Sequence, residues 1–267
     1  VELINNWLFV QTSQVDTAAR HAYIDGKKAG DALRYVVSHE IGHCLGFMHN
    51  MSASANVPLD SLRSPTYTQK YGTTTSIMDY ARFNYVAQPE DSLKGLKLTP
   101  PRFGQYDRFV TAWNYTPTFA DNPQDEYRIT SRWLSEAIKD PLYRYGKQQD
   151  EIIDPRSQTE DLSDDAIGAS TYGISNLKYI MTRMNGWLKD EDIDYSRRRS
   201  LYNAILNQYL QYIGHVYGYV GGIRLYERLS TDPGVNYEPV NADYQRRAMD
   251  FILGEMQDLE WFDNKSI

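Results

Sequence analysis

The sequence predicts an α+β portion at the N-terminal end, followed by a mainly α-helical C-terminal domain that contains a small β-hairpin. Three observations favour this fold class. Strand-forming residues at positions 7–10 precede a helical pattern near positions 31–44. Apolar residues recur at helical intervals between positions 167 and 188, as they do on a helix with one buried face. An Asp-Pro-Gly turn at 232–234 separates two short apolar runs, which is typical of a hairpin.

The chain has 267 residues, enough for one large domain or two small ones. Prolines, Asn122 and acidic residues gather between positions 116 and 130, so we divide the chain into 1–120 and 121–267. The net charge of −7 argues against a nucleic-acid partner or an anionic membrane surface. The single cysteine excludes an internal disulfide, and no apolar run approaches the length that spans a membrane.

The first element in chain order is the segment Trp-Leu-Phe-Val at 7–10. Its residue types favour a strand. Because its four apolar residues are consecutive rather than alternating, a strand buried on both faces or the start of a helix also fits. The next element is a helix that we expect to open with Asp31 as its N-cap. Its buried face would consist of Leu33, Val36 and Val37.

This helix leads into the motif HExxHxxGxxH, which begins at His39 and holds three of the five histidines. His39 and His43 are four residues apart, so they project from one face of a helix. Glu40 is the next residue round the helix from His39, so it lies beside this face rather than on it. Gly46 is the residue type that ends a helix in a left-handed turn. Such a turn would bring His49 back toward the other two imidazoles.

Three imidazoles with an open fourth position are the ligand set of a catalytic zinc ion. We therefore expect one Zn²⁺ held by His39, His43 and His49, with Glu40 as general base for the water that zinc activates. HExxH alone is a weak signal, and solvated histidines on a surface helix are the plain alternative. A thermolysin-like site would need a Glu from a later helix as its third ligand, and His49 makes that unnecessary.

A second motif, Ser-Ile-Met-Asp-Tyr, follows at positions 76–80. HEIGHCLGFMH followed by SIMDY resembles the metzincin clan of zinc endopeptidases, most strongly over positions 31–80 and more loosely to about 115. The resemblance implies that Met78 lies in a tight turn beneath the three zinc-bound histidines. It also implies that Tyr80 is an extra zinc ligand that swings away to stabilise the transition state, as in several families of the clan.

Asn50, which follows the third histidine, is not the Glu, Asp, Pro or Ser of the best-known families. The long C-terminal extension resembles a group of secreted, poorly characterised bacterial metzincins, which implies a secreted, periplasmic or cell-surface location.

Only 38 residues precede His39, whereas the clan places a twisted sheet and a helix there. We therefore expect a fragment whose upper sheet, with the edge strand that aligns a substrate, is truncated.

Four further helices are predicted from capping residues and apolar stripes. A short helix is bounded by Ser64 as its N-cap and Gly72 as its stop. A helix over 104–115 resembles the one that closes the lower metzincin subdomain. A long helix covers 196–217, and the last one follows Asn241.

These observations predict a zinc-dependent endopeptidase that acts on a peptide or protein substrate. Glu40 would take the proton of the attacking water and deliver it to the leaving amine, and Tyr80 would hydrogen-bond the developing oxyanion. Two other classes stay open: a zinc-binding pseudo-enzyme or peptide-binding module, and a zinc hydrolase of a non-peptide bond. The intact Glu40 argues against the first, and amide substrates compared with ester substrates would separate the second. No oligomeric state is predicted.

Overall fold

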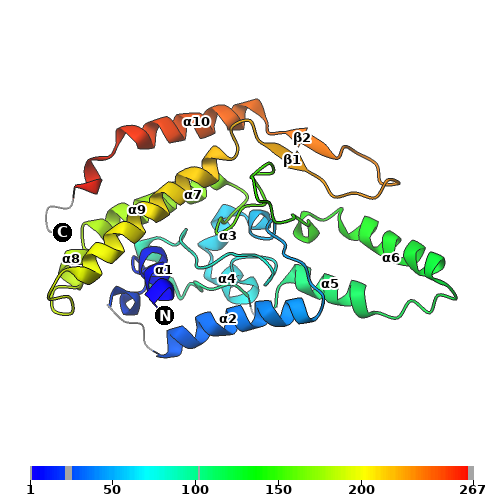
Figure 1. Cartoon of the computed structure of the whole chain (residues 1–267), viewed down its shortest axis with the longest axis horizontal. Helices are drawn as coiled ribbons and strands as arrows, with labels where there is room; N and C mark the ends of the chain where they lie inside the picture. Colours follow the sequence, from blue (N-terminus) through cyan, green and yellow to red (C-terminus); the bar gives the residue numbers. More distant parts are fainter. Residues whose placement is uncertain (1, 22–25, 102, 264–267) are drawn as a thin grey trace.

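The computed structural model describes residues 2–21, 26–101 and 103–263, and most of them are helical (Figure 1). The helices are α1 Glu2–Thr12, α2 Gly26–Cys44, α3 Leu59–Leu62, α4 Pro65–Tyr71, α5 Gln105–Tyr115, α6 Pro123–Ala137, α7 Ala166–Met181, α8 Met184–Trp187, α9 Ser196–Tyr217 and α10 Ala242–Gln257. The strands β1 Ile223–Leu225 and β2 Tyr237–Pro239 form a two-stranded antiparallel sheet. No described helix is long and apolar enough to cross a membrane.

The main core forms where α1 and α10 pack against the pair α7 and α9 (Figure 1). The apolar stripe predicted between 167 and 188 lies in this core, and Ile174, Leu177 and Leu188 are fully buried. In the core, the ring of Tyr212 on α9 lies 4.5 Å from the ring of Tyr85, which belongs to the central loops. These loops lie between α2, at one edge of the molecule, and the α7–α9 pair (Figure 1). They carry part of the site described below.

The strand predicted at positions 7–10 is wrong, because this segment lies inside α1. Its consecutive apolar residues are buried on two sides of the helix. Leu8 packs with Ala32 of α2, whereas Phe9 and Val10 enter the core formed with α7 and α9. A helix held between two partners shows no period-2 alternation and no single apolar face. The hairpin is the only sheet among the described residues.

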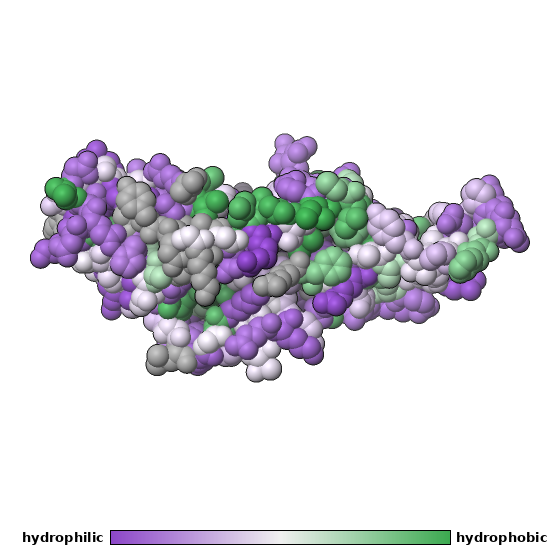
Figure 2. Space-filling view, turned by 90° about the horizontal axis from the view of Figure 1, so that it is seen from below, coloured by the Kyte–Doolittle hydropathy of each residue, from purple (hydrophilic) through white to green (hydrophobic). Residues whose placement is uncertain are grey.

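The helix that carries the motif also differs from expectation. It begins at Gly26, so Asp31 is an interior residue that pairs with Arg34 rather than an N-cap. The face expected to be buried is exposed: Leu33, Val36 and Val37 have 59%, 46% and 47% of their surface accessible. Figure 2 views this side, with α2 toward the reader, and shows a band of hydrophobic side chains among polar ones. No described element packs over this face.

The remaining helix and turn predictions are confirmed in type and place. Ser64 caps α4 by accepting a hydrogen bond from the backbone of Tyr67, and Gly72 ends the helix at φ +75°. The helices predicted over 104–115 and 196–217 are α5 and α9. The last helix, α10, begins after Asn241, whose side chain caps it. Helix α6 begins within the boundary segment, and the division into 1–120 and 121–267 stays a prediction.

Candidate metal centre

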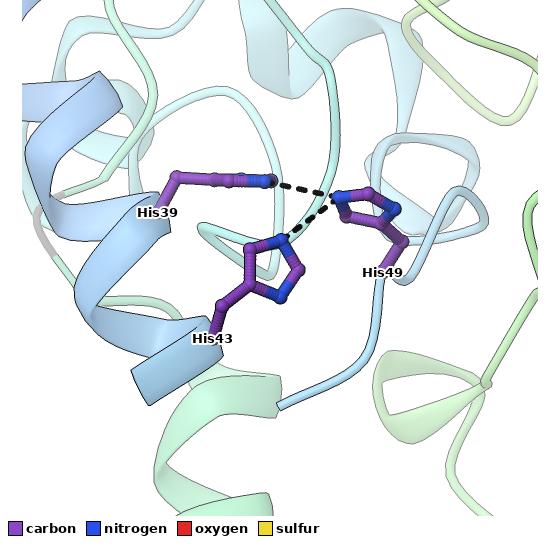
Figure 3. Close-up of side chains that lie close together, drawn as sticks. All are labelled: His39, His43 and His49. Carbon is purple, nitrogen blue, oxygen red and sulfur yellow. Dashed lines mark hydrogen bonds between the residues drawn. The ribbon is translucent and has the colours of Figure 1, made fainter. Parts of the chain in front are cut away.

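Three histidine side chains converge on one point at the C-terminal end of α2 (Figure 3). The helix places His39 and His43 one turn apart on the same face, as their spacing predicts. Gly46 adopts φ +80° just beyond the helix, and this reversal returns the chain so that His49 faces the other two. The Nε2 atom of His49 lies 3.1 Å from Nε2 of His39 and 3.0 Å from Nε2 of His43.

The second nitrogen of each ring has an oxygen partner that accepts a hydrogen bond. His39 Nδ1 lies 2.7 Å from the Ile77 carbonyl, and His43 Nδ1 lies 2.9 Å from the Phe47 carbonyl. His49 Nδ1 lies 2.6 Å from the side-chain Oε1 of Gln148.

Each acceptor places the ring proton on Nδ1, so in the neutral imidazole the Nε2 lone pair is free. Three lone pairs that face one another repel unless a cation lies between them. Burial also lowers the pKa of His39 and favours its neutral form. The set is therefore suited to a metal ion such as Zn²⁺, which neutral imidazole nitrogens bind.

Tyr80 and Glu40 border the same point. The hydroxyl of Tyr80 lies 3.1 Å from Nε2 of His49, and its ring lies over His39 with 5.3 Å between centroids. Glu40 is exposed on α2 beside His39. Its negative charge acts on His39, whose pKa it raises against the larger lowering by burial. The phenol of Tyr80 thus lies at the edge of the histidine cluster, the carboxylate of Glu40 is near enough to His39 to affect its pKa, and both side chains are exposed.

Met78 lies beneath the histidine helix and is completely buried. Its sulfur packs against α2 at Gly42, between His39 and His43, and a side chain at Gly42 would collide with it. The glycine inside the HExxH motif therefore allows the methionine turn to approach the helix closely. Sequence reasoning missed this role, although a glycine within a helix is the signal of such an approach.

Asp107 on α5 holds the methionine turn and was also missed. This buried carboxylate accepts hydrogen bonds from Ser76 Oγ at 2.6 Å and from the backbone N–H of Ile77 at 2.9 Å. It also accepts from the N–H of Gly104 at the start of α5, at 2.6 Å. Because Ile77 in turn accepts the Nδ1 proton of His39, Asp107 supports the first histidine through one intervening residue.

Asp79, next to Met78, is fully buried inside the same turn. Its carboxyl accepts hydrogen bonds from the N–H of Ser54 at 2.6 Å and from Thr74 Oγ1 at 3.3 Å. Burial outweighs these bonds and raises its pKa from 3.8 to about 7. Folding therefore takes up a proton at Asp79 between these two pH values. The stabilising contribution is complete below about pH 4 and is lost as the pH rises through 7.

We expect Asp79 to lower the free energy of unfolding of the metal-free protein by up to ~4 kcal/mol as the pH rises from about 4 to 7, and the difference between wild type and Asp79→Asn isolates this contribution. Asp79→Asn keeps an oxygen acceptor without a charge, so its unfolding free energy should change less with pH. Urea titrations at several pH values in the presence of a chelator measure this. The exposed Asp60→Asn variant is the control and should follow the wild type. Parallel pH profiles for wild type and Asp79→Asn would contradict the assignment.

An apolar cavity of about 420 Å³ adjoins the chain that leads to His49. One wall is the segment Phe47–Met48, directly before the third histidine, and another is α5 with Phe109 and Trp113. The rest of the lining comes from the C-terminal half, with Leu134, Ile138, Pro141 and the segments 143–145 and 225–228. The cavity has room for a large apolar side chain.

These features define a class of protein, because a histidine triad above a buried methionine turn is the centre that the metzincin resemblance implies. Residues 24–267 match the model of the family described as Met-zincin. The match spans most of the chain, and the protein belongs to the Met-zincin family. This confirms the resemblance found in the sequence and supports zinc metallopeptidase-type chemistry. No curated protein and no solved structure is matched by the chain.

Proposed function

We propose that the chain is a zinc-dependent endopeptidase and that His39, His43 and His49 hold its catalytic zinc ion. The observation that carries the proposal is the convergence of three Nε2 atoms whose Nδ1 atoms each have a hydrogen-bond acceptor. When bound, zinc would polarise the scissile carbonyl and lower the pKa of water toward about 7. Three protein ligands leave a coordination position for the reaction, as catalytic zinc sites require.

Glu40 is the proposed general base. It follows His39 on α2, so it borders the cluster and is exposed to an approaching substrate. In this role its carboxylate accepts a proton from the attacking water and passes that proton to the amine that leaves. An amine is a poor leaving group unless it is protonated, so the same side chain serves both steps.

Tyr80 is the proposed hydrogen-bond donor to the oxyanion. Its hydroxyl already lies at the edge of the cluster, 3.1 Å from His49 Nε2. A donor at this place stabilises negative charge that develops only during the reaction, so it affects turnover more than substrate binding.

Tyr80→Phe should therefore lower kcat, with KM and zinc content little changed. Loss of one oxyanion donor costs about 10²–10³-fold in other enzymes. We expect the lower end, about 10²-fold or less, because a metal ion would share the charge. Steady-state kinetics on one peptide, with zinc content measured in parallel, give the result. The exposed Tyr127→Phe variant on α6 is the control. A wild-type kcat in Tyr80→Phe would mean that Tyr80 does not contribute to turnover and serves only as a packing residue of the methionine turn.

A peptide substrate is supported by the apolar cavity beside the third histidine, which can take a bulky side chain. A peptide-binding module without catalysis would have no need for Glu40 at the metal rim. The proposal is tested by digesting a peptide library with the zinc-loaded chain, together with matched amide and ester substrates. Zinc-dependent peptide cleavage that disappears on chelation is expected. Cleavage of esters alone would favour a non-peptide hydrolase, and peptide binding without cleavage would favour the module.

A further inference from the structure

The third histidine has an orienting partner in the C-terminal half of the chain. We propose that Gln148 is a positioning residue that sets the ring of His49 for metal binding, and that Asn50 holds Gln148 in place. The inference rests on the proposed metal site, and it goes further by making metal affinity depend on a segment about a hundred residues beyond the motif. Gln148 Oε1 lies 2.6 Å from His49 Nδ1, across a sequence separation of 99 residues.

The other two histidines are oriented differently. The Nδ1 atoms of His39 and His43 meet backbone carbonyl oxygens of Ile77 and Phe47. A carbonyl is present whatever the side chain, and these two belong to the methionine turn and to the motif itself. His49 alone of the three depends on a side chain. It lies beyond the end of α2, on the loop that follows Gly46, so the helix does not restrain its ring.

Asn50, the residue directly after His49, binds the segment that carries Gln148. Its buried side chain donates a hydrogen bond to the Arg144 carbonyl at 2.9 Å and accepts one from the N–H of Gly146 at 2.8 Å. The N–H of Met51 donates to the Gly146 carbonyl at 2.8 Å. Three hydrogen bonds thus set the register of the segment two residues before Gln148.

The contact at Gly146 is too close for any side chain. A Cβ there would collide with the hydroxyls of Ser52 and Ser157, which also hydrogen-bond each other at 2.8 Å. The segment therefore lies directly on the chain that follows the third histidine. Gln148 itself is exposed, so its side chain contributes no core packing.

This arrangement explains why an asparagine suits position 50. Its amide is donor and acceptor at once, and both functions are used. An Asp at this position would keep the acceptor for Gly146 but would have no donor for the Arg144 carbonyl. It would also place a charge in a buried position. The residue after the third histidine thus connects the motif to the C-terminal half of this chain.

Loss of the acceptor would leave His49 free to rotate and to change tautomer, and metal binding would have to reverse both. Replacing a partner of this kind typically lowers metal affinity by about 10–100-fold. Because Gln148 is exposed, water can replace part of its hydrogen bond. We therefore expect the low end for Gln148→Ala, about tenfold weaker zinc binding. Gln148→Glu retains an acceptor and should restore the affinity.

The experiment measures the zinc dissociation constant by competition with a chromophoric chelator at fixed pH and salt. Because Zn²⁺ is d¹⁰ and lacks a ligand-field spectrum, the visible spectrum of the Co²⁺ form reports ligand geometry. It should change in Gln148→Ala and return in Gln148→Glu. Gln124→Ala on α6, the same substitution at an exposed glutamine, should match the wild type. In the absence of metal, the free energy of unfolding of Gln148→Ala should equal that of the wild type, since no packing is lost.

Asn50→Ala tests the second half of the proposal. If Asn50 acts through Gln148, the double variant should bind zinc no more weakly than Asn50→Ala alone. Additive losses would overturn the link between the two residues. Wild-type affinity and an unchanged Co²⁺ spectrum in Gln148→Ala would overturn the positioning role while leaving the metal site intact. A wild-type chain that binds neither ion would instead refute the proposed metal site itself.

Discussion

Glu40→Ala is expected to abolish peptide hydrolysis while the protein still binds zinc. General acid–base catalysis typically contributes about 10²–10⁴-fold, and we expect the upper end because Glu40 serves both water attack and leaving-group departure. Measuring kcat/KM together with zinc content separates loss of chemistry from loss of metal.

Two further variants sharpen this result. Glu40→Gln preserves the shape of the side chain and removes only its basicity, so it should be as inactive as Glu40→Ala. Glu126→Ala removes an exposed carboxylate from α6 and should behave as the wild type. Wild-type peptidase activity in zinc-loaded Glu40→Ala would refute the mechanism. Activity reduced only as far as in Tyr80→Phe would show that another group moves the proton.

The convergence of the three histidines could be predicted because it depends only on residues that are close together in the sequence. Helical spacing places His39 and His43 together, and a left-handed glycine at position 46 returns the chain to His49. Neither statement requires knowledge of the rest of the fold. The supporting residues are different. Asp107 and Gln148 reach the site from 31 and 99 residues away, across contacts that depend on how the helices pack. Nothing in their local sequence indicates a metal.

In the fold as well, features that depend on neighbouring residues could be predicted, and features that depend on tertiary packing could not. Helices with capping residues, such as α4 after Ser64 and α10 after Asn241, begin where the sequence predicts. The strand prediction at 7–10 is wrong because burial on two sides of the helix removes the periodicity on which such a prediction depends. Val36 and Val37 mark an apolar face correctly, but periodicity indicates only that a face is apolar. Whether another element covers it is decided by tertiary structure, and no described element does.

Removal of one imidazole should release the metal. We expect purified wild type to hold about one zinc per chain, and His43→Ala or His49→Ala to lose most of it at micromolar protein concentration. Two remaining nitrogens cannot complete the three-ligand set that a catalytic site needs. Metal analysis after dialysis gives the zinc content. His21→Ala, which removes an exposed imidazole paired with Glu191, is the control and should keep its zinc.

The same variants should lose the stabilisation that zinc gives. A ligand at a thousand times its dissociation constant stabilises the folded state by about 4 kcal/mol. Added zinc should therefore raise the Tm of the wild type and of His21→Ala, with little effect on His43→Ala or His49→Ala. The rise should shrink in acid, because imidazoles must be neutral to bind a metal and protonation competes with it. Full zinc content and a full Tm response in both ligand variants would mean that the metal is held by other residues.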